Sequence, residues 1–176
     1  MKMPGNWGAT AAECARAQPC DRFISNADDA LYRAVDIAVR PDVAFRWLCQ
    51  LRTAPYSYDW IDNRGRQSPA TLTPGLDQLA IGQRVMGVFR LVDFEPGRHL
   101  TIVLDSPAAA AYLGDVAITY TVSPSESQSR LLVKLLWRYP GGILGTAMRY
   151  TLPWGDLIMM RKQLLNLKHL AESFSG

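Results

Sequence analysis

The sequence predicts an α+β domain in which an antiparallel sheet is covered by one long C-terminal helix. Three observations predict it: a strand pattern at residues 31–39, several strand patterns joined by short turns over 83–138, and an amphipathic helical pattern over 156–172. Strands joined by hairpins and followed by a helix are typical of α+β folds with an antiparallel sheet.

The first strand is expected at residues 31–39, where Val35, Ile37 and Val39 alternate with residues of the opposite face. Pro41 then opens a short helix, because its missing N–H is not needed at the first helical position. Pro55 starts a second short helix, expected at 56–61. The loop over 66–80 is long for a compact domain, which indicates a functional element.

Further strands are expected at residues 84–94, 99–105, 116–122 and 130–138, and residues 107–111 are expected to form a loop of small residues. A helical segment follows Gly142 and is interrupted by Pro153, so Asp156 is expected in the first turn of the last helix. The apolar stripe of this helix recurs at steps of three and four: Leu157, Met160, Leu164, Leu167 and Ala171. We therefore expect Leu164 to face the interior.

Length and composition indicate to which broad class of protein the chain belongs. A chain of 176 residues with 48% hydrophobic residues predicts one domain with a sizeable core, and a net charge of +3 is far from a nucleic-acid-binding profile. No apolar run approaches the length of a membrane span, and the N-terminus lacks the apolar region of a secretory signal. Three cysteines without metal-ligand spacing favour a reducing, cytoplasmic location. We expect no nucleic-acid partner, transmembrane segment, metal or cofactor.

The first 28 residues show no sustained hydrophobic period. We expect them to form an N-terminal arm that is partly disordered or laid on the surface, and whose removal changes the thermal midpoint little. The domain proper is expected at residues 29–176.

Three stretches carry a resemblance to a known superfamily: YRAVDIAVRPDVAFRWL, IGQRVMGVFRLVDFEPGRHLTIVLD and LIMMRKQLLNLKHLAE. In element order and phrasing they resemble the START, Bet v 1 and polyketide cyclase (SRPBCC) superfamily over about residues 29–174. The resemblance implies a helix-grip fold, in which a curved antiparallel sheet wraps around the C-terminal helix. It also implies a cavity for apolar or amphipathic small molecules; members include enzymes, lipid carriers and ligand sensors.

The segment 54–69 is unusual because aromatic residues stand at every second position, Tyr56, Tyr58 and Trp60. The resemblance places it beside the mouth of the cavity, where Tyr58 and Trp60 would form a wall against the ligand. The alternative is that these aromatics are core packing. The full set of expected ligand contacts is Tyr56, Tyr58, Trp60, Phe89, Tyr120, Trp137, Met148, Trp154, Met160 and Leu164.

Catalytic motifs such as GxSxG, HExxH and CxxC are absent from the sequence. The candidates for proton transfer are Asp59, Tyr58 and His99. Each has a simpler interpretation: Asp59 caps a turn, Tyr58 packs, and His99 begins a strand near solvent.

The function predicted from these observations is binding of a hydrophobic or aromatic small molecule, lipid-like or polyketide-like, between sheet and helix. One alternative is a cyclase or dehydratase that uses Asp59 or a Tyr hydroxyl for proton transfer. Another is an interaction or membrane-surface protein that uses basic C-terminal residues such as Arg138, Arg149, Arg161 and Lys162. The sequence also leaves open a weak homodimer.

Overall fold

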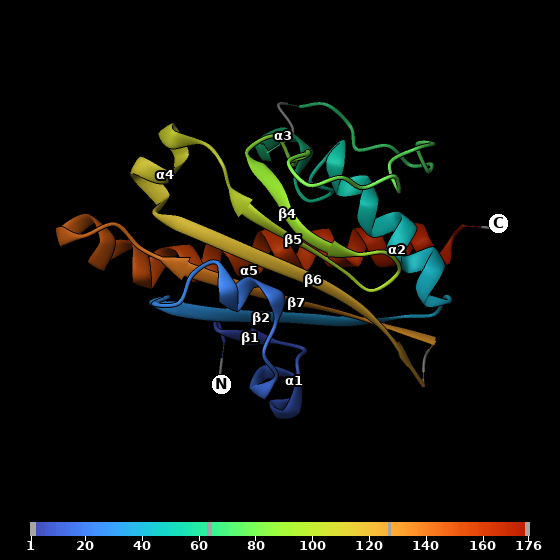
Figure 1. Cartoon of the computed structure of the whole chain (residues 1–176), viewed down its shortest axis with the longest axis horizontal. Coiled ribbons are helices and arrows are strands. Elements are labelled where there is room, and N and C mark those ends of the chain that lie inside the picture. Colours follow the sequence, from blue (N-terminus) through green and yellow to red (C-terminus); the bar gives the residue numbers. More distant parts are fainter. Residues whose placement is uncertain (1–2, 63–64, 127, 175–176) are drawn as a thin grey trace.

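The computed structural model describes residues 3–62, 65–126 and 128–174. Its main feature is an open seven-stranded sheet with the strand order β1-β2-β7-β6-β5-β4-β3 (Figure 1). The strands are β1 (Asn6–Trp7), β2 (Asp29–Ile37), β3 (Arg84–Val85), β4 (Phe89–Glu95), β5 (His99–Leu104), β6 (Asp115–Ser125) and β7 (Gln128–Arg138). Neighbouring strands are antiparallel, except that β1 pairs with β2 in parallel. The predicted α+β class is confirmed.

The helices lie on and around this sheet (Figure 1). The longest is α5 (Gly142–Glu172), which runs along one face and packs against β2 and α2. The shorter ones are α1 (Ala11–Ala15), α2 (Pro41–Cys49), α3 (Asp59–Asp62) and α4 (Pro107–Leu113), with 3₁₀ turns η1 (Pro19–Arg22) and η2 (Gln50–Arg52). A long helix packed against an antiparallel sheet is the expected architecture.

The core forms where alternating strand residues meet the apolar stripe of α5. On β6 and β7 the inward residues are all buried: Val116, Ile118, Tyr120 and Val122, with Leu131, Val133, Leu135 and Trp137. The register places Ile118 opposite Leu135. All five residues of the helical stripe are buried, and Leu164 is completely inaccessible. The predicted inward direction of Leu164 is confirmed.

The strand expected over residues 84–94 is in fact a tight hairpin. Met86 and Gly87 have φ values of 48° and 75°, a left-handed conformation that reverses the chain between β3 and β4. Val85 therefore pairs with Phe89 across the turn. The turn brings Met86 to the rim of the space between sheet and helix.

Two other local expectations were wrong. Residues 107–111 belong to α4, because Pro107 suits its first turn and the Ser106 hydroxyl accepts from the Ala109 N–H. Pro153 does not interrupt the last helix, which is continuous from Gly142 to Glu172. Asp156 consequently lies well inside α5 and does not cap its N-terminus.

In the described part of the N-terminal arm, β1 extends the sheet beside β2, and η1 packs on the face formed by β5, β6 and β7 opposite to α5 (Figure 1). Cys20 is fully buried there with Ile24, Ala117 and Leu136, and its N–H donates to the Thr119 hydroxyl over 2.9 Å. Nearer the N-terminus, Gly8 approaches β2 so closely that a Cβ would lie 2.2 Å from the Ala34 carbonyl oxygen. The arm is therefore laid on the surface with buried contacts of its own.

Ion pairs also attach the N-terminal arm to β7. Glu13 accepts two hydrogen bonds from Arg130 of β7, and Asp21 pairs with Lys134 over 2.6 Å. The hydrogen bonds from Arg130, opposed by burial, lower the pKa of Glu13 to about 2. This lowered pKa makes the contact stabilising above about pH 4.5, the ordinary value, and the stabilisation is lost as pH falls towards 2.

These contacts favour a larger contribution of the arm to stability than its sequence suggests. Deleting residues 1–25 should lower the thermal midpoint by more than about 5 °C, since a loss of ~1 kcal/mol shifts a domain of this size by several degrees. Differential scanning calorimetry at neutral pH measures the shift. The variant Glu13→Gln should show a smaller loss that shrinks as pH falls from 4.5 towards 2. An unchanged midpoint after the deletion would show that the arm packs without stabilising the domain.

Candidate functional site

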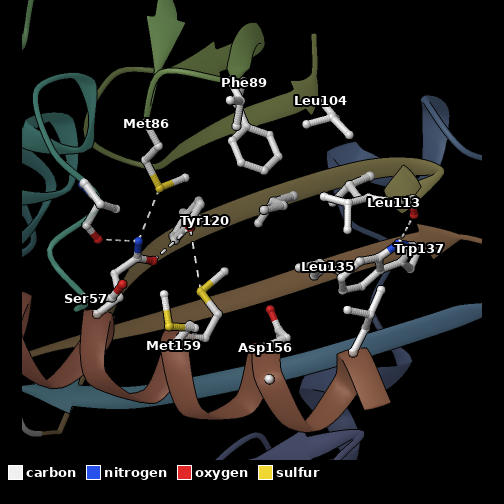
Figure 2. Close-up of a pocket in the computed structure, with 18 residues that line it drawn as sticks. Ser57, Met86, Phe89, Leu104, Leu113, Tyr120, Leu135, Trp137, Asp156 and Met159 are labelled. Atoms are coloured by element: carbon white, nitrogen blue, oxygen red, sulfur yellow. Dashed lines mark hydrogen bonds between the residues drawn. The ribbon is translucent and has the colours of Figure 1, made fainter. Parts of the chain in front are cut away.

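A cavity of about 420 Å³ lies between the inner face of the sheet and α5 (Figure 2). Its size is within the usual range of small-molecule pockets. The walls come from the hairpin turn and β4 (Met86, Val88, Phe89), from β5 and α4 (Leu104, Leu113), from β6 and β7 (Val116, Ile118, Tyr120, Leu135, Trp137), from α5 (Leu152, Gly155, Asp156, Met159, Met160, Gln163), and from Pro55 and Ser57.

The lining is mostly aliphatic, aromatic and thioether side chains. It follows from the alternation of β6 and β7, which turns every second side chain inward, and from the steps of three and four along α5. Phe89 and Trp137 supply aromatic surface on two walls, and Met86, Met159 and Met160 supply flexible surface (Figure 2). Methionine adapts its shape to irregular partners, which suits a wall against a small molecule.

Several of the polar groups around the cavity are already hydrogen-bonded to protein. The Tyr120 hydroxyl donates to Gln163 Oε1 over 2.9 Å, and Gln163 Nε2 donates to the Pro55 carbonyl over 2.6 Å (Figure 2). Burial raises the pKa of Tyr120, so that its hydroxyl stays protonated. The Trp137 indole N–H donates to the Leu113 carbonyl over 2.6 Å.

The most polar feature of the cavity is the buried ion pair between Arg33 of β2 and Asp156 of α5. Arg33 Nη2 lies 2.7 Å from Asp156 Oδ2, and the two side chains are only 1% and 8% exposed. Arg33 Nη1 also donates to the Tyr32 carbonyl. Asp156 lines the cavity, and its carboxylate extends from α5 towards it (Figure 2).

Burial dominates the electrostatics of this pair. It raises the pKa of Asp156 to about 6, although the charge and hydrogen bond of Arg33 act in the opposite direction. Burial also lowers the pKa of Arg33, but a guanidinium remains charged in proteins. At neutral pH Asp156 is therefore a carboxylate in the cavity wall, and its Oδ2 is paired with Arg33.

Comparison with solved structures finds the same architecture elsewhere. A hypothetical protein from Helicobacter pylori matches with a TM-score of 0.56 and 14% identity, over 93% of this chain and 99% of that one. A protein from Mesorhizobium loti matches with a TM-score of 0.54 and 16% identity, over 84% and 99% of the two chains. The chain has the helix-grip fold.

At these identities the similarity to the other helix-grip structures is one of fold alone. A protein from Arthrobacter aurescens gives a further match, with a TM-score of 0.51 and 11% identity, over 84% of this chain and 88% of that one. No family model matches the sequence, and no curated protein matches it either. The chemistry of this cavity therefore follows from its own residues.

The helix-grip cavity contains four of the expected ligand contacts: Phe89, Tyr120, Trp137 and Met160. Tyr56 and Leu164 are fully buried in the core and are not among the residues that line it. Tyr56 has a φ of 56° and turns inward just before α3, while the Asn166 amide donates to its carbonyl.

The structure does not bring Tyr58, Trp60, Met148 or Trp154 to the cavity. Tyr58 is half-buried and Trp60 of α3 is 76% exposed, because residues two apart on a helix point in different directions. On α5 the cavity side is defined by Leu152, Asp156, Met159 and Met160, and Trp154 lies on the solvent side, half-exposed. The predicted aromatic wall from α3 is therefore not part of the cavity.

The candidates for proton transfer also lie elsewhere. Asp59 accepts hydrogen bonds from the N–H and the hydroxyl of Ser68, at 2.8 and 2.6 Å, so it holds the loop after α3. His99 stands on the outer sheet face, 3.3 Å from Asp93. The described residues contain no cluster of side chains that could hold a metal, and no helix among them has the length and apolar character needed to cross a membrane.

Sequence reasoning did not find the ion pair between Arg33 and Asp156. Arg33 lies in a strand that was expected to be half-buried, and its inward direction follows from the alternation that also buries Leu31 and Val35. A charged residue at an inward position of a strand is the signal that would have found it. Pro153 predicts a break that would make Asp156 a helix cap, but α5 continues through Pro153 and places Asp156 in its interior.

Proposed function

We propose that this protein binds a hydrophobic or aromatic small molecule in the cavity between the sheet and α5. The observation that carries the proposal is a space of about 420 Å³ with predominantly apolar walls between the sheet and α5. A recess of this size with mostly apolar walls is typical of small-molecule sites.

The energetics support an apolar ligand. Each Å² of apolar surface removed from water contributes roughly 25 cal/mol, and a molecule enclosed on most sides loses most of its exposed surface. Phe89 and Trp137 add flat surfaces on which an aromatic ring can pack.

The two alternative functions receive less support from the site. The proposed proton-transfer residues Asp59 and His99 lie away from the cavity, so a cyclase-type reaction has no candidate among them. The basic C-terminal residues are partly neutralised: Arg138 pairs with Asp115 and Arg149 pairs with Asp28. Arg161 lies over the ring of Trp7.

A cavity-filling variant tests the proposal. Ile118→Trp places an indole in the space between β6 and α5, and it should weaken binding of the neutral fluorescent probe N-phenyl-1-naphthylamine by at least about tenfold, or ~1.4 kcal/mol. Fluorescence titration measures the affinity, and circular dichroism checks that the variant is folded. Trp60→Ala is the matched control, because Trp60 is exposed on α3 outside the cavity.

The expected result is weak binding to Ile118→Trp and wild-type binding to Trp60→Ala. Equal binding by folded Ile118→Trp and wild type would place the probe outside the cavity. A loss of binding in Trp60→Ala alone would show that the probe binds on the surface of α3.

A further inference from the structure

We infer that the ligand of this cavity is a neutral, hydroxyl-bearing apolar molecule whose hydroxyl donates a hydrogen bond to Oδ1 of Asp156. The inference rests on the proposed function and adds the polar chemistry of the ligand to it. It depends on which hydrogen-bonding groups at the cavity are already used and which are not.

The side chains that line the cavity already use their donors, and the unpaired Nε of Arg33 is buried on a residue that does not line it. Tyr120 donates to Gln163, Trp137 donates to the Leu113 carbonyl, and Gln163 Nε2 lies against both the Pro55 carbonyl and Met86 Sδ. Ser57, the remaining polar lining residue, also has an interaction partner. A ligand that relied on accepting hydrogen bonds would have to break one of these contacts.

Hydrogen-bond acceptors at the cavity, in contrast, remain available to a ligand. Within the part of the chain that the structure describes, Arg33 is the only side chain that donates to Asp156, and it donates to Oδ2. Oδ1 is left without a described partner on a side chain that is more than nine-tenths buried and that lines the cavity. The Tyr120 oxygen, which donates its proton to Gln163, retains lone pairs that can accept as well.

The charges of Arg33 and Asp156 favour a ligand whose hydrogen-bond donor is a neutral group. A ligand carboxylate would meet the negative Oδ1 of Asp156 in an apolar space, where like charges repel strongly. A ligand ammonium would have to lose its water shell beside a carboxylate that Arg33 already neutralises. A hydroxyl carries neither cost and gains a hydrogen bond to a charged acceptor.

The pair is also hard to explain as a device for stability. Desolvation of two charges offsets much of their attraction, so buried ion pairs are often replaceable by apolar residues without loss. A ligand-binding role accounts for its position, because Arg33 holds the carboxylate through Oδ2 while Asp156 lines the cavity.

Three probes of similar shape test the inference: 2-naphthol, 2-methoxynaphthalene and 2-naphthoate, each titrated by displacement of N-phenyl-1-naphthylamine. The wild type should bind 2-naphthol about tenfold more tightly than 2-methoxynaphthalene, which cannot donate. It should bind 2-naphthoate least. In the double variant Arg33→Met/Asp156→Leu the preference for 2-naphthol over 2-methoxynaphthalene should disappear, while both still bind.

A control and a second readout strengthen the test. Arg98→Met/Glu95→Leu removes an exposed ion pair in the β4–β5 turn and should keep the preference. Lowering the pH from about 7.5 to about 5 should reduce the preference in the wild type, since Asp156 takes up a proton with a pKa of about 6. The other ionisable groups that interact with Asp156 are Arg33, Tyr120 and Tyr139, and none of them titrates in that range.

The outcomes separate the inference from the proposed function. Equal binding of 2-naphthol and 2-methoxynaphthalene by the wild type would overturn the inference and leave the apolar cavity as the binding site. Tightest binding of 2-naphthoate would overturn it too. If N-phenyl-1-naphthylamine does not bind and direct titration shows no binding of the three naphthalenes, both the inference and the proposed function are wrong.

Discussion

Replacing Asp156 alone by leucine should lower the free energy of unfolding by about 3–5 kcal/mol, because it leaves Arg33 as an uncompensated buried charge. Arg33 is 1% exposed and has no other carboxylate partner among the described residues. Urea denaturation followed by circular dichroism measures the change. This is the largest single effect expected outside the hydrophobic core.

The double variant Arg33→Met/Asp156→Leu should recover most of that loss, because two apolar side chains replace the desolvated pair. Arg98→Met/Glu95→Leu, which removes an exposed pair, should change stability by less than ~1 kcal/mol. A double variant as unstable as Asp156→Leu would show that the fold itself requires the ion pair.

The pH dependence of the same pair has a definite sign. The pKa of Asp156 is raised from 3.8 to about 6 in the folded state, so the folded protein holds this proton more tightly than the unfolded chain. The contribution of Asp156 to stability is therefore fully present below about pH 3.8 and is lost as pH rises through 6. The stability of the wild type relative to the double variant should fall over that window.

Leu164→Ala should cost about 2–5 kcal/mol, since it empties a site at the centre of the interface between α5 and the sheet. Leu164 is 0% exposed and lies in the core cluster, not in the wall of the cavity. Addition of a cavity ligand should therefore leave this loss almost unchanged. The matched control is Ile143→Ala on the same helix, where the side chain is 91% exposed and the change should stay within about 0.5 kcal/mol. A loss below ~1 kcal/mol for Leu164→Ala would show that the stripe of α5 does not form the core.

The architecture could be predicted from the sequence because its signals are periodic and repeated. Strand alternation recurs along β2, β6 and β7, and the stripe of α5 holds over four turns. Short irregular elements carried weaker signals. The turn at Met86 and Gly87 depends on two left-handed residues, one of which is not glycine, and α4 depends on a single Ser-Pro start.

The cavity could be predicted only in part. Phe89, Tyr120, Trp137 and Met160 were found because they belong to periodic, inward-facing patterns. The pair of Arg33 and Asp156 was missed because it joins residues 123 positions apart, and only the packing of β2 against α5 brings them together. Trp60 misled the prediction because a large aromatic residue in an irregular segment was taken as a sign of ligand contact.

A crystal structure of the protein with 6-bromo-2-naphthol, with the bromine located by anomalous scattering, tests the proposed binding site most directly. We expect one bromine peak between the sheet and α5, enclosed by Phe89, Ile118 and Trp137, with the naphthol oxygen within hydrogen-bond distance of Asp156. Bromine only on the outer surface, beside Trp60 or the exposed side of α5, with the space between sheet and helix unoccupied, would contradict it.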